Sequence, residues 1–77
     1  MIATITYSRH ADKRMRERGV SRTDIEATLR APDMTLPADN GNLWAVRTAP
    51  GGPTTTVVYA VTGHGMFGDA VHVVSVW

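Results

Sequence analysis

Three side chains that suit phosphodiester chemistry fall on one side of a predicted helix. His10, Arg14 and Arg18 are four residues apart, so on a helix they form a slowly drifting stripe. An imidazole can move a proton near neutral pH, and a guanidinium group can clamp phosphate oxygens. These residue types at this spacing suit the handling of a phosphodiester. A structural alternative stays open, in which His10 packs against a sheet and the arginines form a solvated helix face.

The second half of the chain offers partners for this stripe. His72 and Tyr59 are candidates for the complementary proton donor. Arg47 joins the stripe in holding a phosphate if its side chain faces the same side. Trp44, Tyr59 and Trp77 are large aromatics, and an exposed one could stack on an unpaired base. In so small a domain we expect at least two of these three to be structural.

Basic residues are concentrated in the first half of the chain. Seven basic and four acidic residues give residues 1–30 a net charge of +3, whereas residues 31–77 carry a net charge of −2. This separation favours a polyanion or an acidic protein as the partner. The predicted phosphate or RNA contacts outside the stripe are Arg9, Lys13, Arg47 and Trp77.

Length and composition exclude several classes of protein. The 77 residues predict a single domain spanning 1–77, and the absence of cysteine excludes disulfides, thiolate zinc sites and a cysteine nucleophile. His10, His64 and His72 are far apart without neighbouring carboxylates, so we expect no metal and no other cofactor. No apolar run approaches the roughly 20 residues of a spanning helix, so no membrane partner is predicted. The start MIATITYSRH lacks a signal-peptide pattern, and a cytoplasmic protein is expected.

Capping signals predict two helices in the first half of the chain. Ser8 is placed to cap the first helix, and Gly19 ends it in a left-handed conformation. Ser21 and Asp24 form a variant capping box for the second helix, which Pro32 stops. The residues predicted to form the buried face of this second helix are Ile25, Thr28 and Leu29.

The remaining segments predict strands and turns. Strands are expected at residues 2–7, 34–36, 43–48, 54–61 and 70–77, with turns at 39–41 and 50–53. Glycines predict a mobile loop over residues 63–69. Strict alternation in the last strand places His72, Val74 and Val76 on one face, but does not show which face is buried. The order of elements favours an α+β fold with two helices on one face of a curled antiparallel sheet.

Nearly the whole chain resembles a family of small uncharacterised bacterial domains related to the RelE/ParE toxin superfamily. The similarity covers ITYSRHADKRMRERGVSRTDIEATLRAPD, a following strand pair and the closing VHVVSVW. The positions that match the recurrent motif are His10-Ala11, Arg14-Met15, Arg18-Gly19-Val20, Ile25 and Pro32.

The resemblance implies a RelE-like fold and a toxin held in check by an antitoxin. It implies action on RNA, free or on the ribosome, and it carries over His10, Arg14 and Arg18 as motif positions. For such an endoribonuclease we expect metal-free transesterification, with His10 as base or acid and the arginines stabilising the charged phosphorane. The sheet half has fewer basic residues than RelE-type ribonucleases usually place there.

Two other classes of function stay open from the sequence. One is a non-catalytic module of the same fold, in which the basic helix docks an acidic partner and an exposed strand accepts a strand from it. The other is a DNA-binding helix-turn-helix over ERGVSRTDIEATL, although Asp24 and Glu26 occupy the first turns of its recognition helix. Convergence of His10 and Arg14 with residues of the sheet on one concave surface would favour the enzyme.

Overall fold

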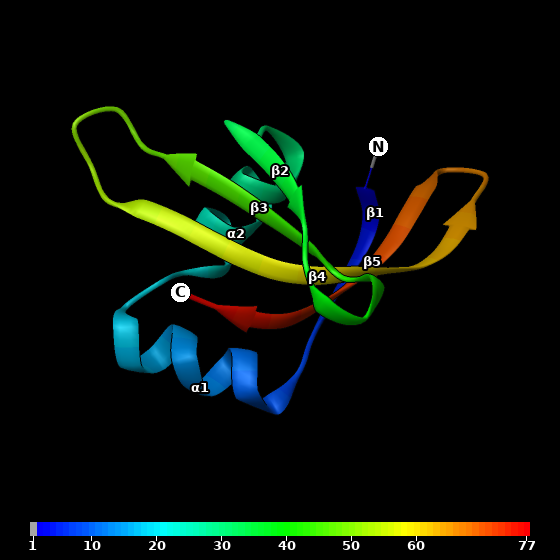
Figure 1. Ribbon diagram of the computed structural model, residues 1–77, viewed down its shortest axis with the longest axis horizontal. Coiled ribbons are helices and arrows are strands. Elements are labelled where there is room, and N and C mark those ends of the chain that lie inside the picture. Colours follow the sequence, from blue (N-terminus) through cyan, green and yellow to red (C-terminus); the bar gives the residue numbers. More distant parts are fainter. Residues whose placement is uncertain (1) are drawn as a thin grey trace.

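The computed structural model describes residues 2–77 and is an α+β domain with one five-stranded sheet (Figure 1). The spatial order of the strands is β1-β5-β4-β3-β2. In chain order the elements are β1 (Ile2–Tyr7), α1 (Arg9–Arg18), α2 (Arg22–Arg30), β2 (Met34–Pro37), the 3-10 turn η1 (Asp39–Gly41), β3 (Leu43–Thr48), β4 (Thr54–Gly65) and β5 (Gly68–Val76). The predicted fold class, with two helices after the first strand, is confirmed.

The sheet is mixed, whereas the sequence predicted an antiparallel one. β1 runs parallel to β5, with Ile5 opposite Val71 and Tyr7 opposite Val73, and the other neighbouring strands are antiparallel. The prediction is therefore wrong for this one pair of strands. A parallel pair requires a long crossover, and here both helices and three strands form it, so no local pattern identifies the partner of β1.

The β4–β5 hairpin is longer than predicted. Cross-strand pairs continue as far as Gly65 opposite Gly68, so only Met66 and Phe67 form the turn. The prediction of a loop over residues 63–69 is wrong. Glycine weakens a strand but does not forbid it, and here the ladder passes through the glycines.

Both helices end and begin as their capping residues predict. The hydroxyl of Ser8 accepts a hydrogen bond from the backbone N–H of Ala11 at 3.0 Å, and Gly19 ends α1 with a φ of 67°. At the start of α2, the Ser21 hydroxyl accepts a hydrogen bond from the backbone N–H of Asp24, and the Asp24 carboxylate accepts one from the backbone N–H of Ser21. No helix in residues 2–77 is long and apolar enough to span a membrane.

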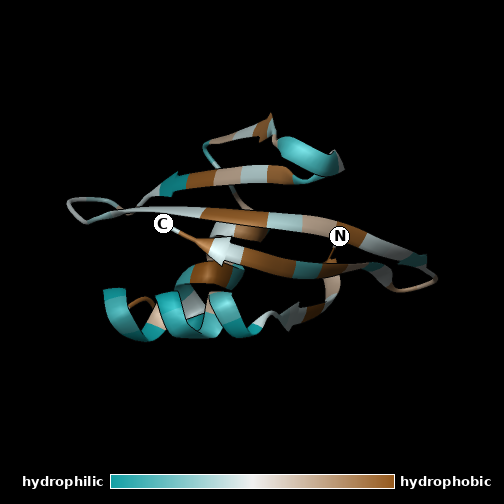
Figure 2. Ribbon diagram, turned by 60° about the horizontal axis from the view of Figure 1, so that its bottom comes forward, coloured by the Kyte–Doolittle hydropathy of each residue, from teal (hydrophilic) through white to brown (hydrophobic). Residues whose placement is uncertain are grey.

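The core lies between the helices and one face of the sheet. Ile25, Thr28 and Leu29 are buried on α2 as predicted. Figure 2 shows that the hydrophilic colour dominates α1, whereas much of the sheet is hydrophobic. The buried apolar residues are Ala11, Met15, Ile25, Leu29, Ala45, Val57, Val71, Val73 and Val76.

A bulge in β5 decides which of its side chains enter this core. Val73 and Ser75 pair with consecutive residues of β4, so Val74 is an extra residue between them. Val73 and Val76 are therefore both fully buried in the core. The strict alternation predicted for residues 70–77 is wrong at this point, since it placed Val73 and Val76 on opposite faces.

The second half of β5 has α1 as its neighbour in place of β1 (Figure 1). The Ser8 amide donates to the carbonyl of Val73 at 2.9 Å, and the Ser8 hydroxyl donates to the carbonyl of Val74 at 2.8 Å. The Arg14 Nε donates to the carbonyl of Val76 at 3.4 Å. Ser8, which caps α1, and Arg14 within it thus donate hydrogen bonds to carbonyls that a neighbouring strand would otherwise pair with.

We expect the substitution Ser8→Ala to destabilise the protein more than Ser21→Ala does. Each change removes a helix cap, which costs about 1 kcal/mol, but only Ser8 also bonds the backbone of β5. Urea unfolding of the two variants measures the difference. Equal losses of stability would show that the bond to Val74 contributes nothing.

We expect Ile25→Ala to lower the free energy of unfolding by about 2–5 kcal/mol, because Ile25 is fully buried between α2 and the sheet. Ile25→Val is the matched control and should cost only about 0.5–1.5 kcal/mol. Thermal and chemical unfolding test both. A loss below about 1 kcal/mol for Ile25→Ala would contradict the placement of this side chain in the core.

Candidate nucleic-acid interface

The sheet has one face covered by helices and one open face. Ala45 and Val57 are opposite each other and buried in the core, so the residues next to them in sequence point to the other side. Cross-strand pairing then places two rows on the open face. One row is Leu36, Trp44, Val58 and Ser75, and the next is Met34, Val46, Thr56 and Trp77.

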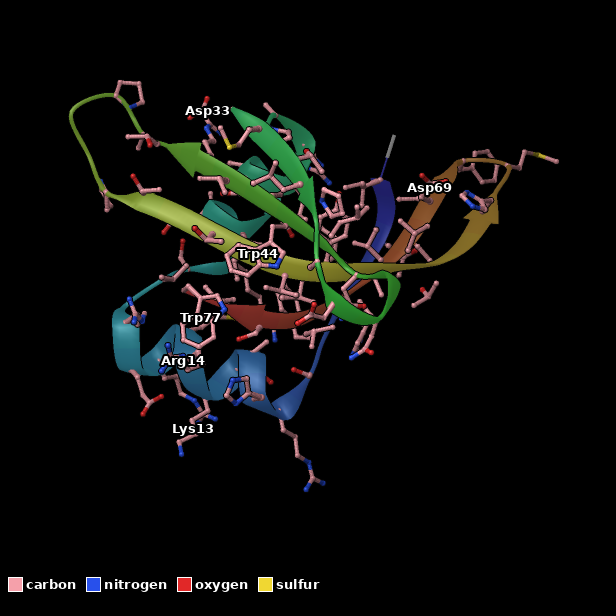
Figure 3. All side chains as sticks on the ribbon, in the orientation of Figure 1. Lys13, Arg14, Asp33, Trp44, Asp69 and Trp77 are labelled. Atoms are coloured by element: carbon pink, nitrogen blue, oxygen red, sulfur yellow. The ribbon has the colours of Figure 1, made fainter. Side chains whose placement is uncertain are left out.

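Large apolar side chains of this open face are accessible to solvent. Trp44 is 40% exposed and Trp77 is 46% exposed, and Figure 3 shows them on the same side of the sheet. Met34 and Leu36 on β2 are 53% and 48% exposed. Of the three large aromatics in the sheet half, Tyr59 packs against the core. The expectation that at least two would be structural is wrong, because the position of each depends on its strand face.

Arg14 borders the open face at the edge formed by α1. Its guanidinium carbon lies 4.2 Å from the centroid of the Trp77 ring, a cation–π arrangement. The bond from its Nε to the carbonyl of Val76 holds the group beside that ring. Lys13 precedes Arg14 on α1 and extends into solvent (Figure 3). A cation and an aromatic ring are thus held together on an accessible surface.

The remaining basic side chains of α1 are close to this border in sequence. His10 lies one turn before Arg14 on the same side of the helix, and it is exposed. Arg18 lies one turn after Arg14 and is also exposed, as is Arg9. The predicted stripe therefore forms an accessible ridge, and the alternative in which His10 packs against the sheet does not fit its exposure.

His72 lies on the open face but is engaged with β1. Its Nδ1 is 2.8 Å from the Thr6 hydroxyl, across the parallel pair of strands. The neighbouring Ser75 is 7% exposed, and its hydroxyl is buried without a hydrogen-bond partner. Sequence analysis did not single out Ser75, because only the register of β5 against β4 reveals that it shares a face with Trp44.

Tyr59 and Arg47 lie on the helix-covered side of the sheet. Tyr59 packs against the core, and burial raises the pKa of its hydroxyl. Arg47 alternates with the buried Ala45 and lines a cavity of about 140 Å³ with Thr23 and Thr28 of α2. The structure therefore does not bring Arg47 or Tyr59 to the ridge of α1, because they are on the opposite face from Trp77.

The electrostatic character of the interface comes from α1 alone. Within residues 2–77, no group of three His, Cys, Asp or Glu side chains is arranged to hold a metal ion. Along the open face, β3, β4 and β5 present aromatic, apolar and hydroxyl side chains together with His72, and α1 supplies the cations and His10. This arrangement can stack a planar group on tryptophan and bind an anion at the adjacent guanidinium.

This geometry gives less support to a DNA-binding helix-turn-helix. α1 and α2 both bury side chains against the sheet, and α2 contacts β3, β4 and β1. Its capping box uses Asp24 in the first turn, where a recognition helix would need donors toward phosphate. The helix-turn-helix hypothesis stays a prediction that no observation tests.

Comparison with known proteins identifies a family but no characterised relative. No curated protein and no solved structure matches the chain. The family described as "Domain of unknown function (DUF4258)" matches residues 7–76, which include both helices, strands β2 to β5 and the last residue of β1. Since this match covers nearly the whole sequence, the chain belongs to the DUF4258 family.

Proposed function

We propose that this protein binds single-stranded RNA on its open sheet face and acts as the toxin of a bacterial toxin–antitoxin pair. The observation that carries the proposal is the Arg14 guanidinium 4.2 Å from the exposed Trp77 ring. The resemblance of residues 5–33 and 71–77 to domains related to the RelE/ParE superfamily supports the same conclusion.

Single-stranded RNA fits this surface better than a duplex does. Trp44 and Trp77 offer exposed rings, and an aromatic ring stacks on a base only when that base is unpaired. Arg14 stands beside the Trp77 ring, where it can contact a phosphate that flanks a stacked base. An apolar face with a basic border on one side therefore matches the alternation of bases and phosphates along a strand.

Cleavage at this surface would follow the metal-independent route. His10 takes the proton of a ribose 2′-hydroxyl, and the 2′ oxygen then attacks phosphorus. Arg14 and Arg18 stabilise the charged phosphorane, and the bond to the 5′ oxygen breaks as that oxygen takes up a proton from a water molecule of the solvent. The accessible positions of all three side chains on one ridge support these roles. The RNA substrate implies action in the cytoplasm.

An acidic antitoxin is the protein partner that fits the same face. Met34 and Leu36 extend the exposed apolar area beyond the two tryptophans, and α1 supplies positive charge at its border. An amphipathic acidic segment would cover the apolar side chains and pair with Lys13 and Arg14, which would exclude RNA. This observation also favours the second candidate function, a module of the same fold that docks such a partner without catalysis.

We expect Trp77→Ala to weaken binding of a fluorescent single-stranded RNA by roughly tenfold or more, because stacking contributes about 1–3 kcal/mol per base. Arg14→Ala should weaken binding too and reduce its dependence on salt concentration. The matched control is Arg30→Ala, since Arg30 is an exposed arginine at the end of α2. Fluorescence anisotropy gives the dissociation constants. Equal affinity in the Trp77 and Arg30 variants would sink the proposal.

We expect the protein to cleave RNA in the presence of EDTA and to leave 2′,3′-cyclic phosphate ends. His10→Ala should slow cleavage by about 10²–10⁴-fold while RNA binding persists, because a general acid or base contributes that factor. Arg30→Ala, which changes an exposed basic residue at the end of α2, is the control and should slow cleavage far less. If the wild-type protein binds RNA and the RNA stays intact, the ribonuclease hypothesis is rejected. The non-catalytic docking module then remains as the candidate function.

A further inference from the structure

The turn of the β4–β5 hairpin exposes two large apolar side chains. Met66 is 91% exposed and Phe67 is 80% exposed, more than any other large hydrophobic residue within residues 2–77. The hairpin extends away from the body of the sheet (Figure 1). Neither residue has a positive φ, so the turn accepts ordinary polar residues, which are the usual choice at such positions. Local structure therefore does not explain this apolar pair.

The charge of the hairpin disfavours a polyanion as its partner. Residues 54–77, which form β4, the turn and β5, contain no lysine or arginine. Next to the turn, Nδ1 of His64 lies 2.8 Å from Oδ1 of Asp69. The histidine beside the turn is therefore already paired with a carboxylate. Binding to phosphates or to anionic lipid depends on Lys or Arg. An apolar protein surface is the occupant that this tip, which lacks lysine and arginine, fits.

A hollow of about 330 Å³ lies beside the same turn. It is bordered by Ala3 and Thr4 of β1, by the turn, and by Gly63 and Ala70 of the hairpin. A cavity of about 150 Å³ is enough to bind a benzene ring, so this hollow has room for a phenyl side chain. Phe67 does not fill the hollow of its own chain, because most of its surface faces solvent.

Gly63 leaves this hollow open, although the backbone conformation at this position does not require glycine. Its φ is not positive, and a Cβ built there would meet only the Cβ of Ala70, at 4.0 Å. A larger residue would therefore fit the strand and would occupy the hollow. Glycine in a strand costs stability and is often found where another group approaches closely.

We propose that two copies of this chain associate through the hairpin, with Phe67 of each copy in the hollow of the other. A protrusion and a hollow on the same surface satisfy each other under a two-fold axis. Burying both pairs of apolar side chains and the hollows removes roughly 1,000 Å² from water, which corresponds to a weak dimer.

Sedimentation equilibrium over a range of protein concentrations tests this dimer. We expect reversible dimerisation of the wild type in the micromolar range, and at least about tenfold weaker association for Phe67→Ser and for Gly63→Leu. The control is Leu36→Ser, because Leu36 is an exposed apolar residue on the open face. It should dimerise as the wild type does. Circular dichroism verifies that Gly63→Leu is folded, and Phe67→Ser lies outside the core.

Mixing the two hairpin variants separates this arrangement from other modes of association. Phe67→Ser alters one border of the hollow but keeps the space between β1 and Gly63, and Gly63→Leu keeps the phenyl group. A mixed dimer therefore regains one of the two contacts, and the mixture should associate more tightly than either variant alone. A wild type that stays monomeric near millimolar concentration would overturn the proposal. Loss of the dimer in Leu36→Ser but not in the hairpin variants would also overturn it and assign the contact to the open face. Neither result depends on RNA binding.

Discussion

The contact between α1 and the unpaired edge of β5 determines both the arrangement of the helices and the character of the open face. β1 ends at Tyr7, whereas β5 continues past it, so the carbonyls of Val74 and Val76 have no strand beside them. A buried carbonyl without a hydrogen bond destabilises the fold, and the Ser8 hydroxyl and the Arg14 guanidinium donate hydrogen bonds to these two carbonyls. The same guanidinium then lies over an exposed tryptophan ring. One structural requirement therefore places a cation at the border of an aromatic surface.

Local signals in the sequence predicted the helices and most strands correctly. The caps at Ser8 and Ser21 and the left-handed Gly19 act through atoms within a few residues, so their effect is readable without knowledge of the tertiary fold. The spacing of His10 and Arg14 is local in the same sense, and it correctly predicted that they share one side of a helix. Their accessibility depends on what α1 packs against, and that information is not local.

The parts that could not be predicted depend on pairings between residues distant in the sequence. Thr6 and His72 are 66 residues apart, and no pattern near either one indicates that β1 lies parallel to β5. The bulge at Val74 has a similar effect, since one extra residue changes which side chains enter the core. The sequence therefore predicted that Arg47 and Tyr59 lie with the ridge of α1. The strand register instead places both on the opposite face from Trp77.

The two proposed surfaces lie toward different ends of the molecule, and this separation has a consequence for their combined action. In Figure 3, Asp69 of the hairpin lies at one end of the longest axis, and Arg14 and Trp77 lie toward the other. That axis measures 35 Å. Association through the hairpins would therefore leave both basic borders uncovered and directed away from the two-fold axis. A single RNA strand long enough to reach both would be held by two sites, so its apparent affinity would exceed that of either site through effective concentration alone.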